Sequence, residues 1–497
     1  MNMNTLTSIT PLVAVCASLF AVPLIFASKK ENIREAWTFA AAFFKFALVL
    51  SMLPYVLDGK NIVWKLVEVL PGLAISFKVD AFGMLFALVS SSLWIVTSMY
   101  SIGYMRTLKE HGQTRYFACF AISLSATLGV AFAGNLLTLY LFYEMLSFAT
   151  YPLVTHHQDR EARSSGRKYL TYILGASIAL VLPAMLFIYT KTGTFEFGPQ
   201  GFMAGAFDKG TLTVLLLMFV FGFAKAGVMP FHSWLPAAMV APTPVSALLH
   251  AVAVVKVGVF CVARVITGVF GTKMLASMGL GIMVCYVASF TIIVSSLIAL
   301  SQDGLKRRLA FSTIGQLSYI ILGIALLSPS GLTGGMLHIA MHAFGKITLF
   351  FCAGAIYAAS GVKNISQMVG IGRRMPFTMA AFTMGALSVI GLPPLGGFIS
   401  KWNLVMGTLE SGQIIFLFVL LGSSLLNAAY FLPICYKAFF CTEEEAMFEK
   451  KIDEVPTWCL VPLCITATCS VLLFFYPQPF MQLAKMTVAT ITGAPMP

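Results

Sequence analysis

The chain consists mainly of long apolar segments that polar or Pro/Gly-rich breaks separate from one another. Many of these segments reach about 20 residues, the length that a helix needs to cross about 30 Å of hydrocarbon. Only 10% of the residues are charged, against about 25% in soluble domains, so the chain cannot cover itself with a hydrated surface. Because the backbone must satisfy its own hydrogen bonds in lipid, we predict that these segments are helices.

The pattern predicts an all-α polytopic membrane protein with about fourteen transmembrane helices. We expect the crossings near residues 6–28, 36–56, 78–104, 115–134, 136–155, 167–190, 211–235, 243–269, 275–300, 308–328, 331–358, 376–404, 413–440 and 456–476. The seventh is interrupted at Pro230, and the twelfth at Gly391, Pro393 and Pro394. Such breaks free backbone groups, which are tolerated mainly where they face protein or water.

The basic residues predict an orientation. Most of the 32 lysines and arginines lie in connections after odd-numbered segments. Connections after even-numbered segments hold only Lys60, Lys65, Lys78, Lys191, Lys209, Arg264 and Lys273. By the positive-inside rule the odd connections are cytoplasmic, and both termini lie on the non-cytoplasmic side of a bacterial or archaeal cell (inner) membrane. The net charge of +13 is therefore explained by the orientation of the chain in the membrane. We expect no nucleic-acid partner. Because Lys29, Lys30 and Arg34 follow the first apolar run, we expect a retained first helix rather than a cleaved signal peptide.

A faint internal similarity indicates a repeat. Residues 135–153 and 303–321 align without gaps, pairing Thr150 with Ser318 and Tyr151 with Tyr319. Each stretch is followed by a second helix and then by an interrupted one, which fits the repeats of ion-coupled transporters. We therefore divide the chain into N-terminal helices (1–114), a first five-helix repeat (115–270), a second one (271–440) and a C-terminal helix with its tail (441–497).

The sequence contains no evident ligand set for a cofactor. Nearly all of the ten cysteines lie inside apolar runs and none forms a CxxC pair, so we interpret them as small core residues. No nucleophile elbow, phosphate-binding glycine loop or carboxylate metal cluster is present in the sequence. We expect no covalent chemistry, no cofactor and no bound metal.

Two charged residues within the apolar segments point to function. Glu144 has about eight apolar or weakly polar residues on either side, and a charge near the bilayer centre costs at least about 2.5–3.5 kcal/mol. Lys225 stands beside the break at Pro230, where it meets hydrocarbon on one side and water or free carbonyls on the other. A carboxylate that swings toward or away from such a lysine would act as a proton switch. The alternatives are a structural ion pair for Glu144 and snorkelling for Lys225.

Further titratable residues continue this pattern. Lys256 follows His250 in one apolar segment, and His338, His342 and Lys346 recur every fourth residue in another, which places them on one helix face. Two histidines four residues apart could bind a metal, but no carboxylate or thiolate accompanies them. A hydrogen-bonded proton relay fits this stripe better, because imidazole titrates near neutrality.

The remaining two buried lysines are interpreted differently. Lys401 follows the second interruption as Lys225 precedes the first, and it would end the relay at an exit on the non-cytoplasmic side. Lys45 lies near the middle of the second segment without a polar companion nearby in sequence, so we interpret it as structural or snorkelling.

These residues resemble those of the antiporter-like membrane subunits shared by respiratory complex I, membrane-bound hydrogenases and Mrp-type cation/proton antiporters. The similar segments are Glu144 with its flank, Lys225-Ala-Gly-Val-Met-Pro-Phe-His-Ser-Trp-Leu-Pro236, Ala241-Pro-Thr-Pro-Val-Ser-Ala-Leu-Leu-His250, His342 with Lys346, and Gly391-Leu-Pro-Pro394 leading to Lys401. The resemblance covers roughly residues 70–480 and implies inverted five-helix repeats around a hydrated polar axis at mid-membrane.

The resemblance also implies roles for these residues. Glu144 and Lys225 would be the coupling pair, Lys256 the central relay and Lys401 the exit-side group. The intervening relay positions would be His250, His338 and His342. A lysine at position 401 resembles the D-type subunit of Mrp antiporters and several complex I homologues.

Three functions remain open at this point. The first is a proton-translocating subunit of a complex I-like oxidoreductase or hydrogenase, and the second is the D-type subunit of a multisubunit Na⁺/H⁺ antiporter. Both imply other membrane subunits and the lipid bilayer as partners, with protons and, in the second, Na⁺ as the transported ions. The third, a stand-alone solute carrier, is less favoured because single titratable groups do not form a pocket for a large solute.

Overall fold

The computed structural model describes residues 5–70, 72–441 and 454–495, and most of them are helical. The N-terminal half contains α1 (Thr10–Ala27), α2 (Glu31–Leu57), α3 (Ala81–Thr107), α4 (Gln113–Ala131), α5 (Leu136–Val154), α6 (Arg160–Ala176), the π-helical turn η1 (Ser177–Val181), α7 (Leu182–Thr192) and α8 (Lys209–Gly222). After α8 the chain forms short helical pieces, namely η2 (Ala224–Ala226), α9 (Trp234–Ala237), η3 (Ala238–Val240), α10 (Thr243–Ala247), η4 (Leu248–Val252), α11 (Val254–Arg264), η5 (Val265–Phe270) and α12 (Thr272–Met278).

Longer helices form most of the second half. They are α13 (Leu280–Ser301), α14 (Leu305–Ala325), α15 (Pro329–Ser360), α17 (Pro376–Ile390), α18 (Gly396–Glu410), α19 (Ile414–Phe440), α20 (Thr457–Phe475) and α21 (Gln478–Thr492), with the short turns η6 (Ile365–Gln367) and α16 (Ile371–Arg374) between α15 and α17. Residues 442–453, inside the predicted C-terminal unit, lie outside the described residues. The helix α21 was not predicted.

The prediction of an all-α polytopic membrane protein is confirmed. Among the described residues, eleven helical stretches are long and apolar enough to cross a membrane. The other predicted crossings correspond to α5 and to the two interrupted segments, α8 with α9 and α17 with α18. Large apolar side chains on the outer helices, such as Phe418 and Leu425 of α19, are exposed, as a lipid-facing surface requires. The exact number of crossings and the inverted repeats stay predictions.

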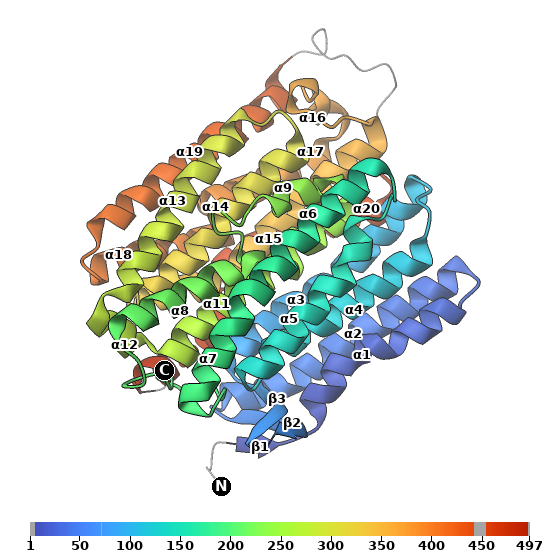
Figure 1. Cartoon of the computed structure of the whole chain (residues 1–497). Helices are drawn as coiled ribbons and strands as arrows, with labels where there is room; N and C mark the ends of the chain where they lie inside the picture. The colour runs from blue at the N-terminus through green and yellow to red at the C-terminus, as the bar shows by residue number, and fades with distance from the viewer. Residues whose placement is uncertain (1–4, 71, 442–453, 496–497) are drawn as a thin grey trace.

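Figure 1 shows how the helices are arranged. α15 runs through the middle of the bundle, α1 and α2 lie along one edge, and α19 lies along the opposite edge. α15 packs against α14, α17, α18 and α20, and the buried face of its long apolar run carries the predicted histidine stripe. The first and the last described residues lie at the same end of the bundle as the small sheet, with the end of the described chain near α12 (Figure 1).

A small sheet corrects two predicted boundaries. β1 (Thr5–Thr7), β2 (Asn61–Leu70) and β3 (Leu73–Val79) form a three-stranded sheet in the order β1-β2-β3. The first and third predicted crossings therefore begin later than expected, at Thr10 and Ala81. In β2 the charged Lys65 and Glu68 interrupt an apolar run too short to cross a bilayer, and its β-branched residues favour an extended chain.

Both predicted interruptions coincide with helix ends in the structure. α8 ends at Gly222, and Lys225 follows on the single turn η2 before Gly227 takes a positive φ of 70°. α17 ends at Ile390, and Gly391 (φ 93°) turns the chain before α18 begins at Gly396. A residue with a Cβ is strained at such φ values, so both breaks depend locally on glycine.

Candidate functional site

Lys225 lies fully buried at the break between α8 and α9. Its Nζ donates to the carbonyl of Tyr143 and to Ser147 Oγ, both at 2.6 Å, and it lies 3.2 Å from the centre of the Tyr143 ring. α11 approaches this turn so closely that a Cβ at Gly258 would clash with the backbone of Lys225 and Ala226. The break thus holds the ammonium group against α5, and snorkelling to the surface is excluded.

A single hydroxyl group, that of Ser147, lies between Glu144 and Lys225. Ser147 Oγ, which accepts from Lys225, lies 3.2 Å from Glu144 Oε2 and can donate to it. The other carboxylate oxygen, Oε1, is buried without a hydrogen-bond partner. Among the described residues, no direct ion pair joins Glu144 to Lys225. The hydroxyl of Ser147 therefore connects the predicted pair.

Glu144 is less enclosed than its place in the middle of an apolar segment suggests. Glu144 is half-buried, on the side of α5 that also presents the exposed Leu141 and Phe148. Glu35 of α2 is only 5% exposed and is paired with Arg106. Position along an apolar segment gives depth in the membrane, whereas the packing of the helix decides which face is covered.

The second group of predicted residues forms a row in the centre of the bundle. Lys256 Nζ of α11 lies 2.7 Å from His342 Nδ1 of α15, and both side chains are buried. The rings of His342 and His338 are stacked with their centres 5.6 Å apart, and His338 in turn stacks on Tyr319 at 5.7 Å. The Lys401 ammonium group lies 4.7 Å from the centre of the Tyr319 ring.

Polar groups from other helices fix this row. His338 has both ring nitrogens in contact, with Gln316 Oε1 at 3.0 Å and Ser400 Oγ at 2.8 Å. Lys401 Nζ donates to the Ile390 carbonyl, which the break after α17 leaves free, at 2.9 Å, and to Ser424 Oγ at 3.1 Å. We call Lys256, His342, His338, Tyr319 and Lys401 the central row.

Two predicted relay residues lie beside the row rather than in it. Lys346 Nζ donates to Ser312 Oγ at 2.8 Å and lies over the Phe431 ring. His250, on the π-helical turn η4, is buried with both nitrogens unpartnered and its ring 4.8 Å from that of Phe350. Among the described residues no hydrogen bond links Lys225 to Lys256, so the two groups are separate in this structure.

Sequence reasoning missed Ser147, Ser312, Gln316, Tyr319 and Ser400 as site residues. Each is a polar side chain inside an apolar helix, and Ser147 and Ser400 lie within one turn of a predicted residue. That proximity was an available signal. The contacts of Gln316 and Tyr319 join different helices and depend on the tertiary packing.

The Lys45 side chain is buried and hydrogen-bonded inside the protein, so the snorkelling interpretation is wrong. The side chain is 1% exposed, and its Nζ donates to Ser18 Oγ at 2.7 Å and to the Leu124 carbonyl at 3.1 Å. These contacts join α2 to α1 and α4. The structure favours the structural interpretation, which was the other alternative.

We expect Lys45→Ala to retain transport within about twofold of wild type, because its ammonium group donates to Ser18 and the Leu124 carbonyl and has no described contact with the Lys225 group or the central row. Proton uptake by reconstituted vesicles measures this, normalised to the amount of assembled protein. An inactive, fully assembled variant would mean that the path extends into α2.

One basic residue counted in a connection lies elsewhere. Arg264 ends α11 inside the eighth predicted crossing, where it is 8% exposed and forms a two-point ion pair with Asp80 at 2.5 and 2.7 Å. Asp80 caps α3 through the backbone nitrogen of Gly83. The pair thus joins two crossings at the end of the bundle near the sheet.

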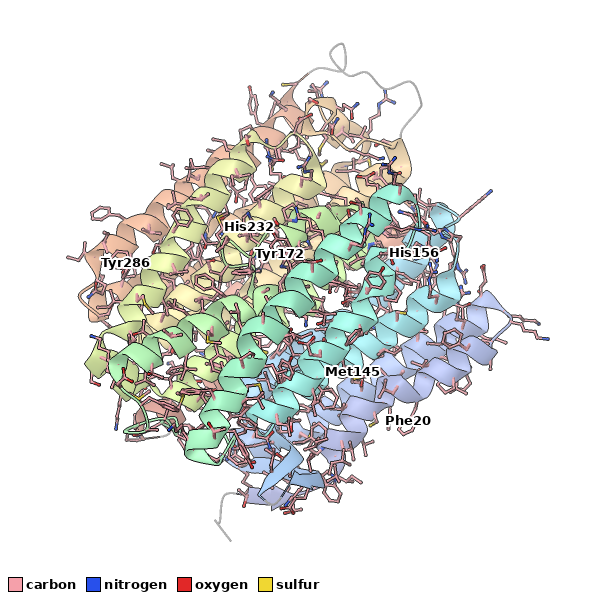
Figure 2. All side chains as sticks on the ribbon, in the orientation of Figure 1. Phe20, Met145, His156, Tyr172, His232 and Tyr286 are labelled. Carbon is pink, nitrogen blue, oxygen red and sulfur yellow. The ribbon has the colours of Figure 1, made fainter. Side chains whose placement is uncertain are left out.

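A cavity of about 780 Å³ lies at the opposite end of the bundle. Its lining includes Glu110, His157, His232 and Lys306, but not Lys225, Lys256 or Lys401. A contact with Glu110 raises the pKa of His157. Burial lowers the pKa of the neighbouring His156 to about 4. Figure 2 shows His156 and His232 on the ribbon in the orientation of Figure 1.

Residues 133–427 match the family model described as the NADH:quinone oxidoreductase/Mrp antiporter transmembrane region. The chain belongs to this family. The matched region contains every predicted site residue from Glu144 to Lys401.

Curated relatives support the same membership. The chain is 33% identical over 392 residues to the N subunit of the NADH-quinone oxidoreductase of Desulforudis audaxviator, covering 76% of this chain and 77% of the relative. It is 29% identical over 459 residues to the A1 subunit of a Na⁺/H⁺ antiporter of Staphylococcus aureus, covering 87% of this chain and 56% of the relative. A probable K⁺/H⁺ antiporter subunit of Rhizobium meliloti is 29% identical, with 97% and 48% covered. The chain thus spans about half the length of the antiporter relatives.

Two solved structures share the fold. A chain of the Mrp complex from a Dietzia species superposes with a TM-score of 0.87 at 22% identity, covering 99% of this chain and 98% of that chain. A chain of the membrane-bound sulfane sulfur reductase, an archaeal respiratory membrane complex, superposes with a TM-score of 0.85 at 23% identity, covering 97% of both chains. At these identities the likeness supports the fold alone.

Proposed function

We propose that this chain is a proton-translocating membrane subunit of a complex I-like or Mrp-type multisubunit assembly. The observation that carries the proposal is the contact of Lys256 Nζ with His342 Nδ1 at 2.7 Å, inside a buried row that leads to Lys401. A buried amine against an imidazole can exchange a proton, since either group can hold it. Family membership and relatives named as subunits of oxidoreductases and antiporters support the same conclusion.

Within this function, we assign the Glu144–Ser147–Lys225 group to control of proton transfer. Lys225 is held by one carbonyl and one hydroxyl oxygen, so its charge is balanced mainly through the neighbouring carboxylate. Movement of Glu144 away from Ser147 would favour proton release from Lys225, and its return would favour uptake. Water or a side-chain movement must then connect Lys225 to Lys256, because no described contact does so.

Partner subunits follow from the position of Glu144. Glu144 is half-buried and shares its side of α5 with the exposed Leu141 and Phe148, although its Oε1 atom is itself covered. A carboxylate next to hydrocarbon is costly, so cover by another membrane protein of the assembly is favoured over lipid. We further propose that residues 115–270 and 271–440 form two five-helix units and that both termini lie on the non-cytoplasmic side.

The D-type subunit of a multisubunit Na⁺/H⁺ antiporter remains the second candidate. The basis is Lys401 at the end of the central row and the similarity to antiporter subunits. A dependence of proton transport on Na⁺ in vesicles that contain the whole complex would favour it. Quinone- or hydrogenase-driven transport without Na⁺ would favour the redox assembly.

Lys256→Ala tests the proposal directly. We expect proton translocation by the reconstituted complex to fall by about an order of magnitude or more, toward the roughly 10²–10⁴-fold typical of a lost acid–base group. A pH-sensitive dye inside proteoliposomes measures the rate, and blue native gels check assembly. If His342→Ala has the same effect and the double variant is no worse, the two groups act as one unit. Wild-type rates in an assembled Lys256→Ala complex would contradict the proposal.

A further inference from the structure

Two connections meet at the end of the bundle opposite the termini. The connection between α3 and α4 carries Glu110 and His111. The connection between α5 and α6 carries His156 and His157. None of the four belongs to the central row or to the Lys225 group. Figure 2 labels His156 at this end of the helices, away from the sheet.

The side chains converge closely enough to share an ion. Glu110, His111 and His156 each present one ligand atom, and these three atoms lie within 4.8 Å of one another. His156 Nε2 lies 3.7 Å from Glu110 Oε2, and the rings of His111 and His156 have their centres 4.9 Å apart. Two ligands bound tetrahedrally at about 2.0–2.1 Å from Zn²⁺ would be about 3.4 Å apart. Small side-chain movements would bring this set to that geometry.

The buried imidazole of His156 provides an independent observation. His156 is 0% exposed, yet neither of its ring nitrogens has a hydrogen-bond partner. A buried polar group without a partner costs about 1–3 kcal/mol. A metal ion on Nε2, the nitrogen that lies 3.7 Å from Glu110 Oε2, would account for one of the two unpartnered nitrogens.

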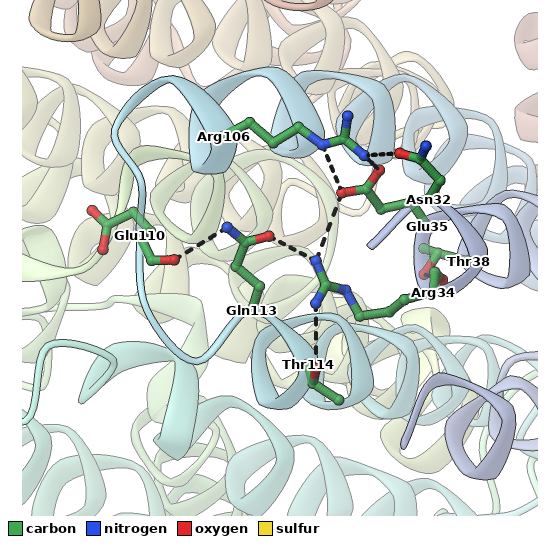
Figure 3. Close-up of polar contacts among 8 residues, drawn as sticks. All are labelled: Asn32, Arg34, Glu35, Thr38, Arg106, Glu110, Gln113 and Thr114. Carbon is green, nitrogen blue, oxygen red and sulfur yellow. Dashed lines mark hydrogen bonds and ion pairs between the residues drawn. The ribbon is translucent and has the colours of Figure 1, made fainter. Parts of the chain in front are cut away.

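The chain holds Glu110 in position for such an ion. Gln113 Nε2 donates to the Glu110 carbonyl at 3.1 Å, and Gln113 Oε1 accepts from Arg34 at 2.7 Å. Figure 3 shows this network and the carboxylate of Glu110 directed away from it. His157 Nε2 lies 3.3 Å from Oε1, which leaves Oε2 on the side of His156. The contact with His157 is of the kind that orients a metal-binding carboxylate from outside the ligand set, while Gln113 holds the Glu110 backbone.

We propose that Glu110, His111 and His156 form a binding site for a divalent transition metal ion of the Zn²⁺ class, with His157 as a positioning residue. Two imidazoles and one carboxylate favour such ions over Mg²⁺ or Ca²⁺, which prefer all-oxygen sites. Three protein ligands leave a fourth position open. His111 is exposed, so an ion can enter from solvent, and once bound it would link the α3–α4 connection to the end of α5.

The test uses the purified complex, stripped with a chelator and titrated with Zn²⁺ in a calorimeter. We expect one site per chain that is lost in His111→Ala and at least about tenfold weaker in Glu110→Gln, since each loses one of three ligands. His111 is exposed, so its variant should fold even if His156→Ala does not. Co²⁺ as a second probe should give the visible absorption of a tetrahedral site in wild type only.

Matched controls come from the neighbouring cavity of about 780 Å³, whose lining includes Glu110 but not His111 or His156. His232→Ala and Glu161→Gln remove a histidine and a carboxylate that line it outside the ligand set, and both should bind Zn²⁺ as wild type does. Zn²⁺ binding that is unchanged in His111→Ala, or absent from the wild-type complex, would overturn the proposal. These readouts do not depend on transport, so they fail or succeed separately from the proposed function.

Discussion

Lys225→Ala is expected to reduce proton translocation to the background of protein-free vesicles while the complex still assembles. The substitution removes the ammonium group that contacts Tyr143 and Ser147, and with it the proton that Glu144 would control. Loss of a group that donates and accepts a proton typically costs roughly 10²–10⁴-fold in rate. The measurement is dye-reported proton uptake in proteoliposomes, normalised to complex content.

Two further variants serve as comparisons for Lys225→Ala, namely Lys225→Arg and Lys45→Ala. Arginine keeps the positive charge but does not release its proton in proteins, so we expect Lys225→Arg to be as inactive as the alanine variant. Lys45 is an instructive comparison, because its Nζ also donates to one serine hydroxyl and one carbonyl in a fully buried setting. Transport by assembled Lys225→Arg would show that the charge alone is needed and that proton release is not.

Glu144→Ala is the second variant expected to lose translocation completely. The carboxylate is the acidic partner of Lys225 through Ser147, and without it nothing in this group alternates between holding and freeing the ammonium charge. We expect Glu144→Gln to fail equally, since the amide keeps the size of the side chain but not its charge. The same vesicle assay measures both variants.

Ser147→Ala tests the role of the Ser147 hydroxyl, which lies between Lys225 and Glu144, apart from that of the Glu144 carboxylate. Water can replace a lost hydroxyl where the site has room and polar neighbours, so we expect a partial loss of several-fold rather than inactivity. If Glu144→Ala pumped at the wild-type rate in an assembled complex, the coupling role of Glu144 would be refuted. If only Ser147→Ala were inactive, the hydroxyl itself would be the essential group.

Much of the fold was predictable because lipid leaves few choices. A chain with few charges and repeated apolar segments must form helices, and glycines and prolines within two of those segments placed the breaks correctly along the chain. The small sheet and α21 were missed. β2 is apolar like a crossing but short, and α21 comes after the last long apolar run, so segment length alone did not identify either of them.

The candidate site was predicted residue by residue, but not its connections. Lys225, Lys256 and Lys401 stand out in the sequence because a charged side chain in a long apolar segment is costly and so rarely incidental. Their partners could not be assigned from spacing, since Ser147, Tyr319 and Gln316 reach the site from other helices. The same limit applies to Glu110 and His156, which are far apart in sequence and meet only in the folded chain.

The sequence by itself determined that this is a membrane protein of helical segments, where its helices break and which titratable groups lie within them, because hydropathy and backbone chemistry are local properties. Only the tertiary structure decided which groups touch: that Lys256 meets His342, that Ser147 stands between Lys225 and Glu144, and that Glu144 is only half covered. The physical reason is that a helix has several faces, and the packing of neighbouring helices selects the one that is buried.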